Sequence, residues 1–130
     1  MKPIEILRKY VEKQSALVNI LVSGLDGNID DLNFKALLPR AIEALGAEWQ
    51  LTPHGVGVLF RNVRTGEVID AHVGFLESPD IFDAWRIEGY VRSLKQEDVA
   101  PGHWARILEQ LARDGWVTPY PGYANHYVLT

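Results

Sequence analysis

Apolar residues recur every three or four positions in four segments of the chain, a spacing that places them on one face of an α-helix. The segments are residues 3–22, 33–45, 80–94 and 102–114. Glycine or a polar run follows each of them, as expected where a helix ends. Pro39 lies inside the second segment, so a helix that begins at or just before Pro39 is an alternative there. The pattern therefore predicts four helices.

The third helical segment begins among acidic residues, which are favourable near a helix N-terminus. Ser78 or Asp80 is expected to cap this helix. We expect Trp85 to face the core of the protein. Arg86 follows Asp83 by three positions on the same helix, so the two side chains are expected to form a surface ion pair.

Segments rich in β-branched and aromatic residues predict the strands of the fold. Residues 48–51 are predicted to form a short first strand. Residues 56–63 and 67–75 are predicted to form a hairpin, in which Gly66 supplies the positive φ that the turn requires. A turn signal at residues 120–123 predicts two further short strands, one on either side of it.

The order of these elements predicts an α+β fold. We expect an antiparallel sheet centred on the hairpin of residues 56–75, packed by about four helices, with a C-terminal two-strand hairpin. A chain of 130 residues has the size of one domain, so residues 1–130 are predicted to form a single globular domain.

Composition excludes several classes of protein. The absence of cysteine rules out disulfides, thiolate metal sites and a cysteine nucleophile. Nucleic-acid binders usually have a basic face, and a chain with a formal charge of −4 is not expected to have one. No stretch approaches the roughly 18 apolar residues of a membrane span. Charged residues interrupt the apolar positions of the N-terminal segment, so we do not expect it to be a signal peptide. We therefore expect a cytoplasmic protein that binds neither nucleic acid nor a membrane.

One set of residues has the composition of a metal site. His54 lies at the start of the predicted hairpin, and Asp70 and His72 lie two positions apart on its second strand, where both point to the same face. Two histidines and a carboxylate are able to hold Zn²⁺ or Fe²⁺, which defines a small metal-dependent enzyme as one alternative function. In the other interpretation, the histidines form hydrogen bonds in the sheet and Asp70 accepts hydrogen bonds or pairs with Arg86.

No catalytic or cofactor motif is complete in the sequence. None of the serines lies in a nucleophile elbow. Gly55 and Gly57 lack the third glycine of a dinucleotide-binding loop, and they begin a predicted strand instead of opening a helix. An acid–base pair of His72 with Asp83 or Glu77 is the remaining enzymatic alternative. We therefore expect no catalytic residue and no cofactor.

The C-terminal segment LARDGWVTPYPGYANHYVLT resembles the end of a winged-helix domain, in which a helix is followed by a strand, a turn and a second strand. The helix before the wing enters the major groove of DNA in such domains. Arg106 and Arg113 of that helix are offset by Glu109 and Asp114, and the turn contains no lysine or arginine. Because phosphate contacts dominate DNA affinity, a DNA-binding regulator is the less favoured alternative.

Acidic residues gather in two places, in the loop after the first predicted helix and around the start of the third. They are Asp26, Asp30 and Asp31 in the first segment, and Glu77, Asp80 and Asp83 in the second. Acidic loops and exposed tyrosines suit contact with a basic protein. The predicted contact residues are Asp30, Asp31, Glu77, Asp80 and Tyr123. In the alternative interpretation, these carboxylates are solvated loop residues and helix caps.

The segment HGVGVLFRNVRTGEVIDAH is followed by FDAWRIEGYVRS. These residues combine His-Gly-x-Gly at the start of a hairpin, Asp-x-His on its return strand and Phe-Asp-x-Trp-Arg at the start of a helix. The combination resembles a family of small bacterial proteins of unknown function, which are similar in size and character to immunity proteins of polymorphic toxin systems. The resemblance implies a non-enzymatic cytoplasmic protein that neutralises a cognate toxin by occluding its active site.

Overall fold

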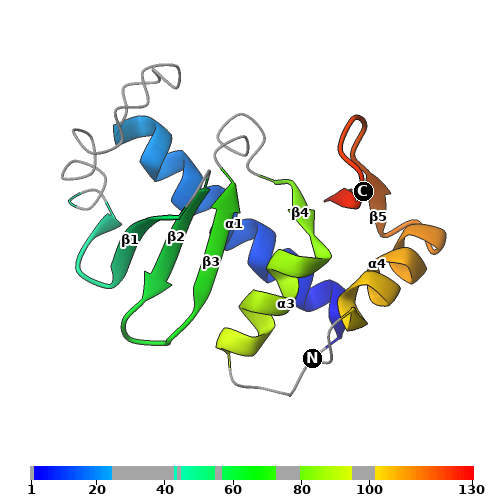
Figure 1. Cartoon of the computed structure of the whole chain (residues 1–130), viewed down its shortest axis with the longest axis horizontal. Coiled ribbons are helices and arrows are strands. Elements are labelled where there is room, and N and C mark those ends of the chain that lie inside the picture. Colours follow the sequence, from blue (N-terminus) through cyan, green and yellow to red (C-terminus); the bar gives the residue numbers. More distant parts are fainter. Residues whose placement is uncertain (1, 25–42, 44, 55–56, 73–79, 95–101) are drawn as a thin grey trace.

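The structure, a computed structural model, has three helices and six strands in the part of the chain that it describes (Figure 1). The described residues are 2–24, 43, 45–54, 57–72, 80–94 and 102–130. The helices are α1 (Pro3–Gly24), α3 (Ala84–Ser93) and α4 (His103–Arg113). The strands are β1 (Trp49–His54), β2 (Gly57–Asn62), β3 (Val68–His72), β4 (Phe82–Asp83), β5 (Val117–Pro119) and β6 (His126–Leu129). None of the described helices combines the length and the apolar character that a membrane crossing requires.

Strands β1, β2 and β3 form an antiparallel sheet in which β2 is central. Phe60 of β2 pairs with Leu51 of β1 and with Ile69 of β3, and all three side chains are buried. Side chains that pair directly across a sheet point to the same face. This face packs on α1, which runs behind the sheet and continues past it toward α3 (Figure 1).

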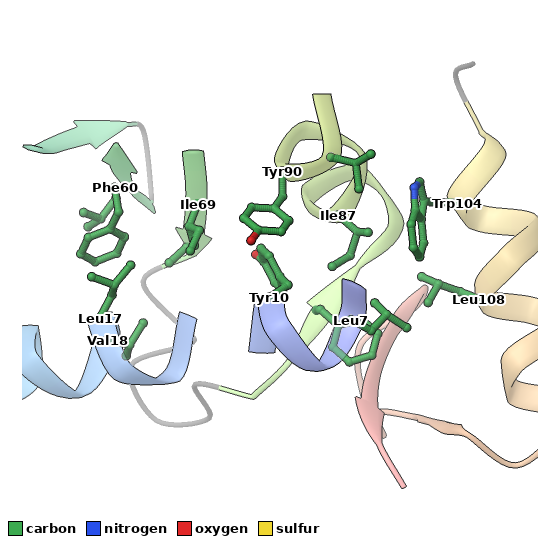
Figure 2. Packing of buried hydrophobic residues seen from close by; sticks show 14 of the residues in the cluster. Leu7, Tyr10, Leu17, Val18, Phe60, Ile69, Ile87, Tyr90, Trp104 and Leu108 are labelled. Atoms are coloured by element: carbon green, nitrogen blue, oxygen red, sulfur yellow. The ribbon is translucent and has the colours of Figure 1, made fainter. Parts of the chain in front are cut away.

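Helix α1 extends along one hydrophobic core that includes residues of both sheets. Leu17 lies toward Phe60 of the first sheet, and Leu7 lies toward Ile87 of α3 and Leu108 of α4 (Figure 2). The long apolar stripe of α1 therefore connects two parts of the chain that are built from distant segments. This placement follows from the helical spacing of its apolar residues.

Polar residues on the buried face of α1 add specific links to the core. The hydroxyl of Tyr10 donates a hydrogen bond to Oε1 of Gln14 at 2.6 Å, and Nε2 of Gln14 donates to the carbonyl oxygen of Ile81 at 2.7 Å. The Tyr10 ring meets the ring of Tyr90 on α3 edge to face, with 5.2 Å between centroids (Figure 2). These contacts fix the position of α3 relative to α1.

The turn between β2 and β3 has the geometry that its sequence predicts. Gly66 has a φ of +79°, a conformation that favours glycine. The side-chain oxygen of Asn62 accepts hydrogen bonds from the backbone N–H groups of Arg64 and Thr65, at 2.9 and 3.0 Å. These bonds close the turn and set the register of the hairpin.

The predicted two-strand C-terminal hairpin is wrong, because a third strand joins it. Strand β6 pairs with β5 and also with β4, which gives the antiparallel order β4–β6–β5. Phe82 pairs with Tyr127 and Asp83 pairs with His126. Phe82 is fully buried, and its ring stacks on Tyr127 with 6.5 Å between centroids. A strand of two residues has no detectable alternation in the sequence, and its pairing partners lie far along the chain.

The predicted count of four helices is also wrong for the described part of the chain, which has three. The helix predicted for residues 80–94 begins only at Ala84, because β4 precedes it and Asp83 provides its N-cap. Most of the helix predicted for residues 33–45 lies outside the described residues. The protein is α+β, with two three-stranded sheets and the helices packed on one shared core.

Candidate functional site

The predicted metal residues fall at one end of the first sheet. The register pairs His54 with Gly57 and Gly57 with His72, so the two histidines occupy positions on either side of β2. Asp70 pairs with Leu59, two positions earlier on β3. The side chains of His54 and His72 are outside the described part of the structure, and no group of three acidic or histidine residues within that part is arranged to hold a metal. The metal set stays a prediction.

Of the five predicted partner contacts, the structure describes Asp80 and Tyr123, and both are exposed. Asp80 lies two residues before the start of β4, and Tyr123 lies in the turn between β5 and β6. Asp30, Asp31 and Glu77 lie outside the described residues. The predicted interface therefore stays a prediction, with two of its members on the surface.

Trp85 is the most exposed large apolar side chain in the described ranges, at 64% of its full exposure. The prediction that it faces the core is wrong. The buried face of α3 is formed instead by Ile87, Tyr90 and Val91, which are spaced by three and four positions. Trp85 lies two positions before Ile87 and therefore on the opposite side of the helix.

The carboxylate of Asp83 joins the start of α3 to strand β6. One of its oxygens accepts a hydrogen bond from the backbone N–H of Arg86 at 2.8 Å and so caps the helix. The other oxygen pairs with the Arg86 guanidinium and lies 3.4 Å from Nε2 of His126. The predicted pair of Asp83 and Arg86 forms, although its side chains are only 10% and 14% exposed and do not lie on the open surface.

A series of contacts connects Trp85 to Tyr123 across this junction. The Arg86 guanidinium lies over the Trp85 ring, 5.9 Å from its centroid. On the other side of Asp83, the rings of His126 and Tyr123 lie 5.8 Å apart. Tyr123 is 56% exposed. We call these five residues the aromatic surface.

A pocket of about 210 Å³ opens beside Trp85, between α3 and the first sheet. Its lining includes Leu59, Val68, Asp70, Trp85, Gly89 and Arg92. We call it the Asp70 pocket. Pockets that enclose a whole small-molecule ligand measure roughly 300–1,000 Å³. The Asp70 pocket is smaller than that range and has the size of a single long side chain.

The two arginines of the pocket have acidic partners. Arg86 pairs with Asp83, and Nη2 of Arg92 lies 3.6 Å from Oε2 of Glu88. Asp70 is half-buried and forms no ion pair with another residue in the described ranges. The described charges around the pocket therefore leave one negative charge without a compensating partner.

Tyr90 lines the pocket and also belongs to a buried hydrogen-bonded group. Its hydroxyl donates to Oε2 of Glu67 at 2.9 Å; the same carboxylate pairs with Lys13 and accepts a hydrogen bond from Oγ1 of Thr65 at 3.0 Å. Burial, together with the nearby Glu67, raises the pKa of Tyr90, so the phenol stays protonated at neutral pH. Burial alone would raise the pKa of Glu67, but hydrogen bonds from Lys13, Tyr90 and Thr65 hold it below its usual value.

The hydroxyl of Ser93 connects the end of α3 to β3. It donates a hydrogen bond to the carbonyl oxygen of Tyr90 at 2.6 Å and accepts one from the backbone N–H of Val68 at 2.9 Å. Helix α3 thereby covers the outer edge of β3, which would otherwise present unpaired backbone groups. Ser93, Tyr90 and Glu67, which lie beside the pocket, therefore stabilise the fold. The exposed side chains around the pocket are the ones available for contact with a partner.

Helix α4 is followed by the β5–β6 hairpin, which is the order that the resemblance to a winged-helix domain implies. The exposed residues of α4 include Arg106 and Arg113, but also Glu109 between them. Phosphate contacts from basic residues dominate DNA affinity. The charge pattern of this helix therefore gives no support to the DNA-binding alternative.

Comparison of the chain with curated proteins and with solved structures gives no significant match. A family model described as a domain of unknown function (DUF6896) matches residues 3–128. The match includes residues 54–93, which carry the resemblance found in the sequence, together with Trp85, Tyr123 and the lining of the Asp70 pocket. Because it extends over nearly the whole length of the sequence, the chain belongs to the DUF6896 family.

Proposed function

We propose that this chain is a non-enzymatic protein-binding domain whose partner docks on the aromatic surface. The observation that carries the proposal is the exposure of Trp85 and Tyr123, at 64% and 56%, on either side of a largely buried ionic junction. Tryptophan, tyrosine and arginine are the residues that most often dominate the binding energy of protein interfaces. The aromatic surface exposes a tryptophan and a tyrosine, and the largely buried Arg86 lies against the tryptophan ring.

The junction also supports tight binding, because it holds the surface in place before a partner arrives. Asp83 contacts both Arg86 and His126, and these two side chains lie against the rings of Trp85 and Tyr123. Immobilising a flexible side chain on binding costs roughly 0.5–1.5 kcal/mol. Side chains that are already held by neighbours reduce this cost.

For the partner, we propose a basic protein. The chain has a net charge of −4, and opposite charge accelerates the encounter of two proteins. Asp80 is exposed, and Asp30, Asp31 and Glu77 are proposed to extend the acidic contact. The more specific proposal follows the resemblance of the sequence: the partner is a bacterial toxin, and this chain acts as its immunity protein by occluding the active site.

The first test is affinity capture with the tagged full chain, followed by measurement of Kd for the captured partner. Trp85→Ala and Tyr123→Ala are each expected to weaken binding by about 2 kcal/mol, about 30-fold, as interface hot spots do. Trp116→Ala is the matched control, because Trp116 is 48% exposed but lies beyond α4, where Arg8 covers its ring. Unchanged affinity of both variants would show that the partner docks elsewhere.

The immunity proposal also predicts that the partner is toxic on its own. A cognate toxin arrests growth when it is expressed alone, and co-expression of this chain restores growth. Under the proposal, Trp85→Ala reduces the rescue and Trp116→Ala does not. A captured partner that is harmless when expressed alone would overturn the immunity proposal and leave the protein-binding proposal in place.

The register of the first sheet favours a second candidate, a small metal-dependent enzyme. His54 and His72 occupy positions on either side of Gly57, and Asp70 lies two positions before His72 on β3. Elemental analysis of protein purified without chelator tests this candidate. Stoichiometric zinc or iron that His72→Ala removes, with an unchanged circular dichroism spectrum, would support it. Metal-free protein would argue against it.

A further inference from the structure

We propose that the Asp70 pocket receives a basic side chain of the protein partner, arginine or lysine, with the Asp70 carboxylate as its ionic anchor. The identity of the partner rests on the proposed function. The preference of the pocket for a cationic side chain rests on the size, charge and walls of the pocket itself. The identity of the partner and the preference of the pocket are therefore tested separately.

The size of the pocket favours a side chain over a whole ligand. Its volume of about 210 Å³ lies below the range of pockets that enclose complete small molecules. The pocket opens directly beside Trp85, which stands on the aromatic surface. A partner that docks on Trp85 therefore brings its own side chains to the mouth of the pocket.

The charge of the pocket favours a cation. Asp83 pairs with Arg86 and Glu88 pairs with Arg92, so each arginine on the wall is balanced by an acid next to it. Asp70 has no such partner within the described ranges. An arginine or lysine that enters would pair with a half-buried carboxylate, whereas a glutamate or aspartate would meet a like charge.

The walls of the pocket suit the long stem of a basic side chain. Leu59, Val68 and Trp85 provide apolar surface along which methylene groups are able to pack. An ammonium or guanidinium group close to an aromatic ring gains further attraction from the face of that ring. A short basic side chain with no stem, such as a histidine, would use less of these walls.

Gly89 offers a way to fill the pocket without disturbing the fold. It lies on the lining within α3, and a Cβ placed on it meets no atom within 4 Å. Gly89→Leu should therefore occupy the pocket with an isobutyl group and cause no backbone clash. Gly89→Ala makes the same change to the backbone and adds only a methyl group, so it is the matched control.

The experiment titrates the full chain with three blocked tripeptides, Gly-Arg-Gly, Gly-Lys-Gly and Gly-Glu-Gly, and follows the indole N–H of Trp85 by NMR. We expect saturable shifts with the arginine or lysine peptide, at millimolar Kd, and none with the glutamate peptide. Asp70→Asn should weaken this binding about tenfold or more, since it removes a charged hydrogen-bond partner. Gly89→Leu should abolish the binding, and Gly89→Ala should retain it.

Three outcomes would overturn the proposal: no saturable shift with either basic peptide, shifts that persist unchanged in both Asp70→Asn and Gly89→Leu, or tighter binding of the glutamate peptide. These outcomes are distinct from failure of the proposed function. If the captured partner loses affinity with Trp85→Ala while the basic peptides do not bind, the pocket assignment is wrong and protein binding stands. If the peptides bind as expected but no partner depends on Trp85, the pocket is a cation site and the docking surface is wrong.

Discussion

Neutralising Asp83 should destabilise the protein chiefly through the loss of its charge opposite Arg86. Asp83→Asn retains an acceptor for the Arg86 backbone N–H, because asparagine caps a helix about as well as aspartate. It removes the negative charge beside the guanidinium group of Arg86, whose side chain is only 14% exposed. Breaking a buried ion pair costs about 3–5 kcal/mol. We expect the lower end, about 3 kcal/mol, because the Arg86 side chain is not completely buried.

Urea unfolding followed by circular dichroism measures this loss, and thermal unfolding should show a decrease in Tm of about 10 °C. Asp83→Ala removes the helix cap as well and should cost about 1 kcal/mol more than Asp83→Asn. Asp80→Asn is the control, because Asp80 is exposed and an exposed substitution changes stability by less than about 0.5 kcal/mol. If Asp83→Asn is as stable as Asp80→Asn, the ion pair does not stabilise the start of α3 and the reasoning is refuted.

Three further predictions concern the pocket wall, the buried carboxylate and the core. Gly89→Ala should raise the free energy of unfolding by about 0.5–1 kcal/mol, since Gly89 lies inside α3 with open space at its Cβ; a decrease in urea unfolding would contradict this. A carboxyl group whose pKa is lower in the folded than in the unfolded protein stabilises the fold at pH values above its unfolded pKa. This stabilisation is lost as the pH falls through the folded pKa. Glu67 has such a lowered pKa, so stability should decline below about pH 4.3, and Glu67→Gln should flatten this acid limb of the stability curve. Phe60→Ala should cost about 3–5 kcal/mol by urea unfolding, because Phe60 is fully buried between α1 and the first sheet; a loss below about 1 kcal/mol would show that the site is not packed in this way.

The long elements could be predicted because their periodic patterns extend over many residues. The apolar stripe of α1 continues for most of its 22 residues, so a helix is the only regular structure that places it on one face. The β2–β3 hairpin is equally local, since Gly66 and Asn62 form its turn within a few positions of each other. Where local sequence determines the structure, the prediction and the structure agree.

The proposed docking surface and the Asp70 pocket could not be predicted in the same way, because distant segments assemble them. The Asp70 pocket combines residues of β2, β3 and α3, and no sequence pattern places Asp70 beside Gly89. The contact between Asp83 and His126 depends on the pairing of β4 with β6. Two residues are too few for strand periodicity to be recognised, so the sequence gives no signal for this pairing.

The exposure of Trp85, on which its proposed role depends, has a more specific explanation. Ile81 and Trp85 are four positions apart, and a helix from residue 80 would place both on its buried face. Ile81 is indeed buried, but it lies before β4 and outside the helix. Once Ile81 is removed from the pattern, Ile87, Tyr90 and Val91 define the buried face of α3, and Trp85 lies opposite to it.

The short strand therefore determines which side chains α3 presents at the proposed docking surface. By ending the extended segment at Asp83, β4 makes α3 begin at Ala84, and the same carboxylate that caps the helix holds Arg86 against the exposed ring of Trp85. A helix that began four residues earlier would include Asp83 in its first turn, so this carboxylate would no longer be at the N-cap position. It follows that a variant of Asp83 should lower partner affinity by more than its effect on the folded fraction alone explains.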